Sequence, residues 1–330
     1  MDVRKMLVLR SSRARPQLRG DVAATCRAWS EDREPRRRPF PAPPVAAMLL
    51  LVVAQALAAP PDEGLIARIT GLEPEVKAGV VKVSVPRTAL TITVDGVKLE
   101  PFQGLTSWAA FQTSGEGTIL MGDLALAEDE VDAVMTAALA NGLSVTALHN
   151  HFAFDHPSVL FMHLDGTGTT ERLATALRKT LDAVQQVRRT PVPAESFGGP
   201  EIPATSTIEP KPLEAILGRS GQVKNGMVKF VFERKTTMHG AELGAAMGVS
   251  TWAVFAGSPE SAVVDGDFAM LESEVQGVLK ALRAADIHVV ALHSHMLHEQ
   301  PRIVFLHYWG KGPADGLAHA LKKAMATQRK

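Results

Sequence analysis

The 330-residue sequence contains one cysteine, few aromatic residues and no excess of either charge. Cys26 lies in an N-terminal stretch that we expect to be removed, so the mature chain would have no disulfide, cysteine nucleophile or thiolate metal ligand. Aromatic residues make up 5%, with a single tyrosine, which argues against an aromatic platform for sugars or bases. Basic and acidic residues both number 35, so the charge does not indicate a nucleic-acid or acidic-membrane partner.

A long apolar run is also lacking. The run Val45–Ala54 falls short of the roughly 20 residues that a membrane span needs. It follows an Arg- and Pro-rich stretch and precedes Ala56-Leu57-Ala58, which together are typical of a secretory signal peptide. We therefore expect residues 1–59 to be an N-terminal extension and signal peptide, cleaved near Ala58 or Ala59. The alternative is an unstructured tail with a chance apolar patch.

The sequence repeats itself after 144 positions. This shift brings Trp108 onto Trp252 and Asp123 onto Asp267, and it aligns A-L-H-N-H at 147–151 with A-L-H-S-H at 291–295. So long a period indicates a duplicated domain rather than an array of small repeats. The Pro-rich stretch 188–212 is typical of a linker. We expect a first module at 60–187 and a second at 213–330.

Both copies show the same order of strand-like and helix-like segments. In the first copy β-rich runs lie at 80–85, at 90–94, around Trp108 and at 119–122, 145–151 and 158–164. Val131, Val134, Met135 and Ala138 recur at helical spacing, and a last helix is expected at 170–184. The order is roughly ββββαββα per copy. It predicts an α+β fold, a tandem duplicated module of antiparallel sheet packed with helices.

Each copy carries two histidines in H-x-H and a third twelve residues later. Alternate residues of a strand share a face, so His149 and His151 should point the same way. His163 lies on the next strand, and pairing it with His149 would centre the turn at residue 156. Three imidazoles around one point are a typical open zinc arrangement, and imidazole also binds copper, iron and nickel. The predicted metal ligands are His149, His151, His163, His293, His295 and His307.

Carboxylates accompany the histidines in both copies. Asp155 and Glu299 occupy equivalent positions in the following loop, where each could be a fourth ligand, a partner that orients an imidazole, or a general base. Asp123 and Asp267 follow a glycine at a strand end, where aspartate more often caps a turn.

The motif A-L-H-[NS]-H followed by P-x-[VI]-x-F-x-H, with G-D-[LF]-A upstream, resembles the LppY/LpqO family of exported bacterial proteins. The resemblance covers most of residues 65–325. It implies export and a duplicated fold, and it brings no established activity. Family members carry lipid anchors, whereas this chain has no cysteine at the expected cleavage site.

Three functions remain open on the sequence. The first is an exported protein, periplasmic or extracellular, that binds a divalent transition metal such as zinc through both histidine clusters. The second is a metal-dependent hydrolase with Asp155 or Glu299 as base. The third is a non-catalytic structural or partner-binding protein with core histidines. The expected partner is a metal ion or small molecule, with no nucleic acid and no stable membrane span in the mature chain. We expect the two modules to pack on each other.

Overall fold

A computed structural model describes residues 59–115, 117–190 and 195–328. The predicted signal peptide therefore lies, except for its last residue, outside the described residues. Within them, no helix is both long enough and apolar enough to cross a membrane.

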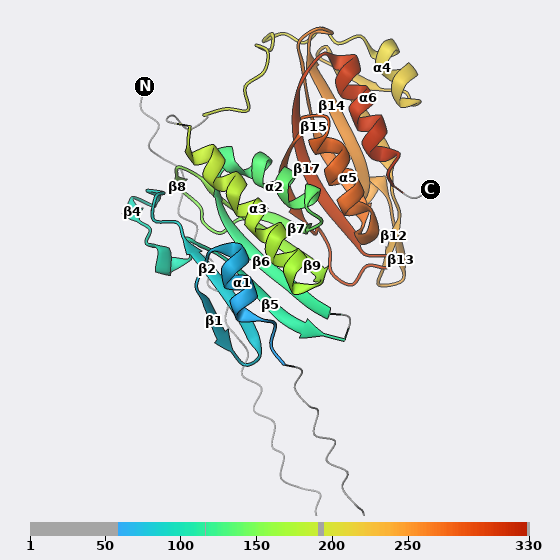
Figure 1. Cartoon of the computed structure of the whole chain (residues 1–330). Helices are drawn as coiled ribbons and strands as arrows, with labels where there is room; N and C mark the ends of the chain where they lie inside the picture. The colour runs from blue at the N-terminus through green and yellow to red at the C-terminus, as the bar shows by residue number, and fades with distance from the viewer. Residues whose placement is uncertain (1–58, 116, 191–194, 329–330) are drawn as a thin grey trace, which may run out of the picture. The chain divides into compact units, whose positions relative to one another are not determined.

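A continuous antiparallel sheet of twelve strands runs through both modules (Figure 1). Its strands, in spatial order, are β1 (Pro74–Lys77), β2 (Val80–Pro86), β5 (Thr106–Ser114), β6 (Gly117–Ala127), β9 (Val159–Gly168), β7 (Ser144–Asn150), β16 (His288–His293), β17 (Ile303–Gly312), β15 (Ala262–Leu271), β14 (Ser250–Gly257), β11 (Met227–Glu233) and β10 (Gln222–Lys224). The second half repeats the first in reverse order, so the fold confirms both the duplication and the α+β class.

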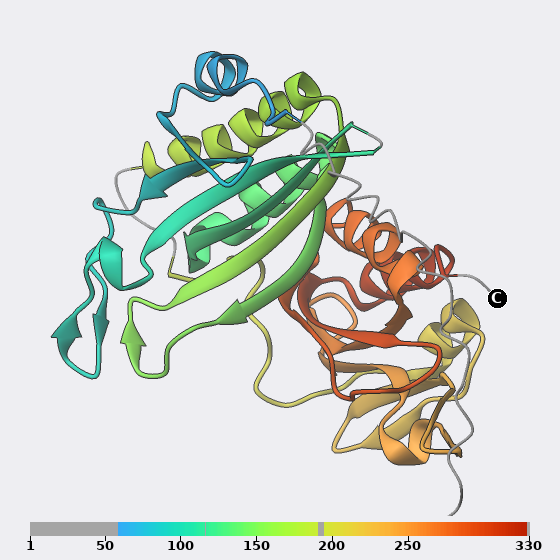
Figure 2. The same ribbon diagram turned by 90° about the horizontal axis from the view of Figure 1, so that it is seen from below.

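Helices lie along one face of the strands in each module, and the first module shows this in Figure 2. They are α1 (Glu63–Thr70), α2 (Val131–Ala140), α3 (Thr170–Arg188), α4 (Pro210–Leu217), α5 (Val275–Arg283) and α6 (Ala314–Met325). The apolar positions that predicted the central helix, among them Val134 and Met135, are fully buried against the sheet. Gly71 ends α1 with a φ of 69°, a conformation that favours glycine.

The opposite face of the sheet, here called the open face, is covered by no α-helix of the described residues. A small apolar cluster on it packs under the hairpin of β3 (Thr93–Val94) and β4 (Val97–Lys98), and includes Leu105, Ala125 and Phe161. In the second module β12 (Thr236–Met238) and β13 (Ala241–Leu243) take this place. Single turns of 3-10 helix at 101–103, 128–130, 245–247 and 272–274 complete each copy.

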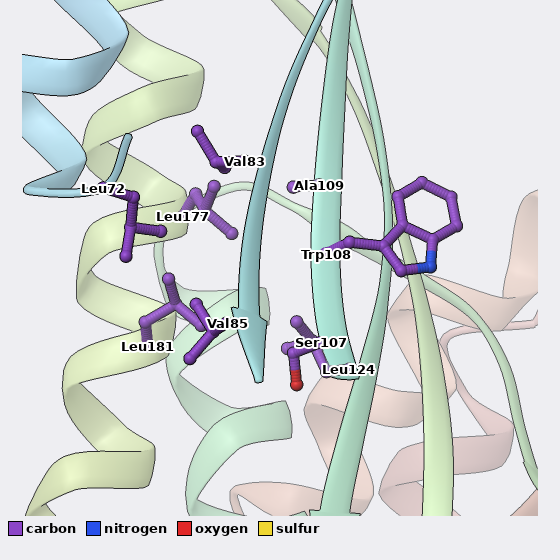
Figure 3. Close-up of a pocket in the computed structure, with 9 residues that line it drawn as sticks. All are labelled: Leu72, Val83, Val85, Ser107, Trp108, Ala109, Leu124, Leu177 and Leu181. Atoms are coloured by element: carbon purple, nitrogen blue, oxygen red, sulfur yellow. The ribbon is translucent and has the colours of Figure 1, made fainter. Parts of the chain in front are cut away.

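Figure 3 shows the two faces at one point of β5. Leu177 and Leu181 of α3 meet Val83, Val85 and Leu124 in a small apolar pocket on the helix side. Trp108 projects from the other side of the strand, onto the open face.

The predicted strands differ from the observed ones in three respects. Of the predicted strand 90–94 only Thr93–Val94 is a strand, and it pairs with β4 and with β8 (Asp155–His156) outside the main sheet. β7 ends at Asn150 and β16 at His293, so His151 and His295 lie beyond their strands. The two edge strands of the main sheet, β1 and β10, were not predicted; they are mostly exposed and lack a buried apolar face.

The modules meet where β7 lies beside β16, with Leu148 paired to Leu292. Gln276 of α5 bonds both backbone groups of Val145, accepting at 3.1 Å and donating at 2.8 Å. Asp132 of α2 forms an ion pair with Arg283 and a hydrogen bond with Nδ1 of His288. The contact between the modules is thus both apolar and polar. Between Arg188 and Pro210 the described residues form no helix or strand, and the predicted module boundaries stay a prediction.

Candidate metal centres

The structure brings the three histidines of the first copy together on the open face. His149 is on β7, His163 is on the neighbouring β9, and His151 follows the end of β7. The ring of His149 lies 5.1 Å, centroid to centroid, from each of the other two rings. One nitrogen from each ring lies within 4.8 Å of one from each of the others, close enough for all three to bind one metal ion.

The second copy repeats the cluster. The ring centroids of His295 and His307 lie 4.9 and 5.0 Å from that of His293. The Nε2 atoms of His293 and His295 are 3.1 Å apart. Two nitrogens bound to one tetrahedral zinc at 2.0–2.1 Å would be separated by about 3.3–3.4 Å, so these two atoms lie near ligand spacing.

The strand register explains how the rings meet. His149 pairs with Phe161, and His163 pairs with Ala147, so the predicted direct pairing of the two histidines was wrong. The two residue numbers of each pair still add up to an even number. His149 and His163 are therefore diagonal neighbours on one face. A bulge between Val145 and Ala147 precedes them, and β16 has its counterpart between Val289 and Ala291.

A phenylalanine holds the histidine that lies beyond the strand in each copy. The ring of His151 stacks on that of Phe161 with centroids 3.4 Å apart and planes 5° apart. His295 stacks on Phe305 in the same way, at 3.5 Å and 9°. Stacking on a fully buried ring restricts the orientation of each imidazole and compensates for the loss of strand geometry.

Two buried ring nitrogens have no hydrogen-bond partner within the described part of the chain. The Nδ1 atoms of His149 and His293, which are equivalent in the two copies, are buried there without a hydrogen bond. Buried polar atoms in folded proteins nearly always have partners, so these two rings are incompletely satisfied within the described residues. Nδ1 of His307 faces the carbonyl oxygen of Gly266 at 3.4 Å, which leaves its Nε2 free for a ligand role.

Asp123 and Asp267 supply a buried carboxylate beside each trio. Oδ1 of Asp123 lies 3.9 Å from Nε2 of His163, and it has no hydrogen-bond partner among the described residues. Oδ2 of Asp267 lies 3.9 Å from Nε2 of His295, while its Oδ1 accepts the N–H of Leu306 at 3.1 Å. The structure therefore places these two residues, interpreted from the sequence as turn caps, next to the histidines.

Burial shifts the titration of several of these groups. It lowers the pKa of His151, His293 and His295, and nearby imidazoles lower them further. Neutral imidazoles are the form that binds metal. Burial raises the pKa of Asp267 to about 6, against the opposing influence of His307.

Asp155 and Glu299 lie in the loop that joins the histidine strands. Oδ2 of Asp155 accepts the N–H of Val159 at 2.7 Å, and Oε1 of Glu299 accepts that of Ile303 at 3.2 Å. Both are buried, and neither belongs to the groups of side chains that converge for a metal. These contacts brace the loop, and the role of the two carboxylates as ligand or base stays a prediction. His156 and His298 also lie outside the two converging groups.

Two features of the site were not predicted from the sequence, namely the stacking of Phe161 on His151 and the position of Asp123 beside His163. The signal was present, because both residues recur after 144 positions as Phe305 and Asp267. Only the register shows that Asp123 is the direct cross-strand partner of His163, as Asp267 is of His307.

Comparison with known proteins adds a family and no activity. The family model described as Domain of Unknown Function (DUF1259) matches residues 65–183 and again 211–327, once for each module. No functionally curated protein matches the chain. Among solved structures, the crystal structure of a trimeric bacterial microcompartment shell protein, PduB, is 12% identical over 77% of this chain and 89% of that one. Its TM-score is 0.18, too low to support any argument.

Proposed function

We propose that this chain, which belongs to the family described as Domain of Unknown Function (DUF1259), binds one divalent transition metal ion in each module. The observation that carries the proposal is the same in both copies. Three imidazoles converge, and one nitrogen of each ring lies within 4.8 Å of one from each of the others. Core histidines kept only for packing would not need to converge in this way.

Zinc is the ion we favour for these sites. Each trio consists of nitrogen ligands alone, and three histidines with an open fourth position suit zinc, while copper, iron and nickel also accept imidazole. Asp123 and Asp267 each lie 3.9 Å from Nε2 of a histidine of the trio, and each would act beside the metal as a further ligand or as a proton acceptor.

A metal-dependent hydrolase is the second candidate. It is favoured by the buried carboxylate 3.9 Å from a ligand histidine in each copy. A bound zinc would supply Lewis acidity and lower the pKa of a bound water. Asp123 and Asp267 would then hold or receive a proton near that position, in addition to Asp155 and Glu299 as predicted from the loop.

Export to the periplasm or the cell exterior, with cleavage near Ala58 or Ala59, is part of the proposal. It is supported by the apolar run and the A-x-A sequence that precede the first module. We further propose that the chain is a member of the LppY/LpqO group, on the repeated A-L-H-[NS]-H motif.

Elemental analysis of the mature chain, purified without chelating resin after growth in zinc-supplemented medium, tests the metal proposal. We expect about two metal equivalents per chain and one in the double variant His149→Ala/His151→Ala. His319→Ala, which changes a histidine outside both clusters, is the control and should keep two. A metal-free wild type that is folded would contradict the proposal.

A further inference from the structure

A tryptophan extends the row of cross-strand partners that leads to the first trio, and a lysine of the neighbouring row lies beside it. Trp108, Asp123 and His163 are successive cross-strand partners on β5, β6 and β9, so their side chains share the open face. Trp252, Asp267 and His307 form the same row in the second module. Figure 3 shows Trp108 pointing away from the helix-side pocket, toward this face.

The lysine ammonium lies over the tryptophan ring in both copies. Nζ of Lys82 is 4.5 Å from the ring centroid of Trp108, and Nζ of Lys229 is 4.6 Å from that of Trp252. A cation over the face of tryptophan is attracted by the ring, which limits where an otherwise flexible ammonium can lie. Each module thus presents an oriented positive charge on the same face as its histidine trio.

The surroundings of the two lysines differ. Lys82 belongs to a second row of cross-strand partners, in which the residue on β6 is Met121. Met121 is 60% exposed. In the row of Lys229 the equivalent residue on β15 is Asp265, and burial raises the pKa of its carboxyl against the opposing influence of Lys229. The first module therefore has an exposed apolar surface beside its lysine, where the second has a carboxylate.

Other carboxylates lie at the two ends of the row that contains Lys82 and Met121, and none lies between these two residues. Glu75 pairs with Lys82 on β1, which lies on the side away from the trio. Asp165 pairs with Met121 on β9, next to the trio. Trp108 and Met121 thus form the apolar part of the open face between Lys82 and the trio, with Glu75 beyond Lys82 and with Asp123 and Asp165 on the side of the trio.

We propose that the first module binds an organic anion with an apolar body, held at one end by the metal-loaded trio and at the other by Lys82. The strands that carry Lys82 and His163 are three strand spacings apart, which is about 14 Å, and the lysine side chain shortens the span to be bridged. The body would lie on Trp108 and Met121. Because the metal is one of the two anchors, this inference rests on the proposed function.

Calorimetric titration of the zinc-loaded mature chain with α,ω-dicarboxylates from succinate to sebacate tests the inference. Monocarboxylates of equal length, such as octanoate for suberate, are the one-ended controls. We expect one dicarboxylate length to bind about fivefold more tightly than its monocarboxylate, the gain of one favourable exposed ion pair. Lys82→Met should remove that difference and leave the zinc content at its wild-type value.

Two further variants sharpen the test. Met121→Asp places the carboxylate of the second module in the first and should abolish the dicarboxylate preference, whereas Lys229→Met should leave it unchanged. Equal affinity of dicarboxylates and monocarboxylates for the zinc-loaded chain, or no effect of Lys82→Met, would overturn the inference while the metal site stands. A chain that takes up no zinc would remove the proposed function, and the inference with it.

Discussion

The imidazole of His151 stacks on the ring of Phe161, 3.4 Å away between centroids, although His151 lies outside the strand that carries its partner His149. The same relationship joins His295 to Phe305. In each copy a buried aromatic ring on one strand thus sets the position of a loop histidine that the backbone alone does not fix. The geometry of the metal centre depends on this contact as well as on the β-strand register.

Phe161→Leu should therefore weaken zinc binding in the first module. The loss of stacking lets His151 rotate, and we expect a decrease in affinity of about tenfold, at the lower end of what is typical for residues that orient a ligand. Phe111→Leu is the matched control, since Phe111 is equally buried but is on the helix side of the sheet. It should lower stability by a similar amount without changing zinc affinity, as competition with a chromophoric chelator would measure. Equal effects of the two substitutions on affinity would contradict this role.

Asp123→Asn should also weaken zinc binding in the first module, because it removes the negative charge 3.9 Å from Nε2 of His163. We expect roughly a tenfold loss of affinity. Asp129→Asn, which changes a carboxylate paired with Arg188 on the helix side, is the control for a lost charge. The same chelator competition measures both variants. An unchanged affinity in Asp123→Asn would show that this carboxylate is only structural.

Arg87→Met should destabilise the protein strongly. Arg87 and Glu130 form an ion pair at 2.6 Å, and their side chains are 6% and 0% exposed. Removing one partner leaves a buried charge without its main compensation, at a cost of about 3–5 kcal/mol. Arg188 also contacts Glu130, at 2.9 Å, and this contact remains in the variant. We therefore expect a loss of stability at the lower end of that range. Urea unfolding measures the loss, and Lys98→Met, in an exposed pair with Glu100, should change stability by less than about 1 kcal/mol.

Gly266→Ala should destabilise the second module. A Cβ there would overlap the carbonyl oxygen of Trp252 and the hydroxyl of Tyr308, so strands β14 and β17 would have to shift. Overpacking of this kind typically costs about 1–3 kcal/mol. Gly316→Ala is the control, since no atom lies within 4 Å of the added Cβ and the residue is in α6. It should raise stability by up to about 1 kcal/mol, and thermal unfolding would distinguish the two.

Much of the fold could be predicted because the duplicated sequence shows the same pattern of helices and strands twice. Val131, Val134, Met135 and Ala138 predicted a helix, and all four are buried on one side of α2. The strand at 90–94 was wrong because its apolar residues pack in a small cluster under a hairpin rather than in the main sheet. Local sequence does not distinguish these two environments for Ile92, which is buried in either.

The candidate site could be predicted in part for the same reason. Side chains alternate along β7, and the paired residue numbers add up to an even number, so His149 and His163 share a face. Any even sum gives this result, whichever residues pair directly. The repeat marks Phe161 and Asp123 as shared residues, but it does not predict that His151 leaves the strand and stacks on Phe161, or that Asp123 is opposite His163. Both depend on which residues face each other across strands, and register is set by the whole sheet rather than by the segment.

The most direct test of the account is an anomalous-scattering measurement at the zinc edge on crystals of the zinc-loaded mature chain. We expect two peaks per chain, each about 2.0–2.1 Å from one nitrogen of each of three histidines, namely His149, His151 and His163 in one site and His293, His295 and His307 in the other. Peaks at other positions, or trios without a peak in protein that has been saturated with zinc, would contradict the metal centres proposed for both modules.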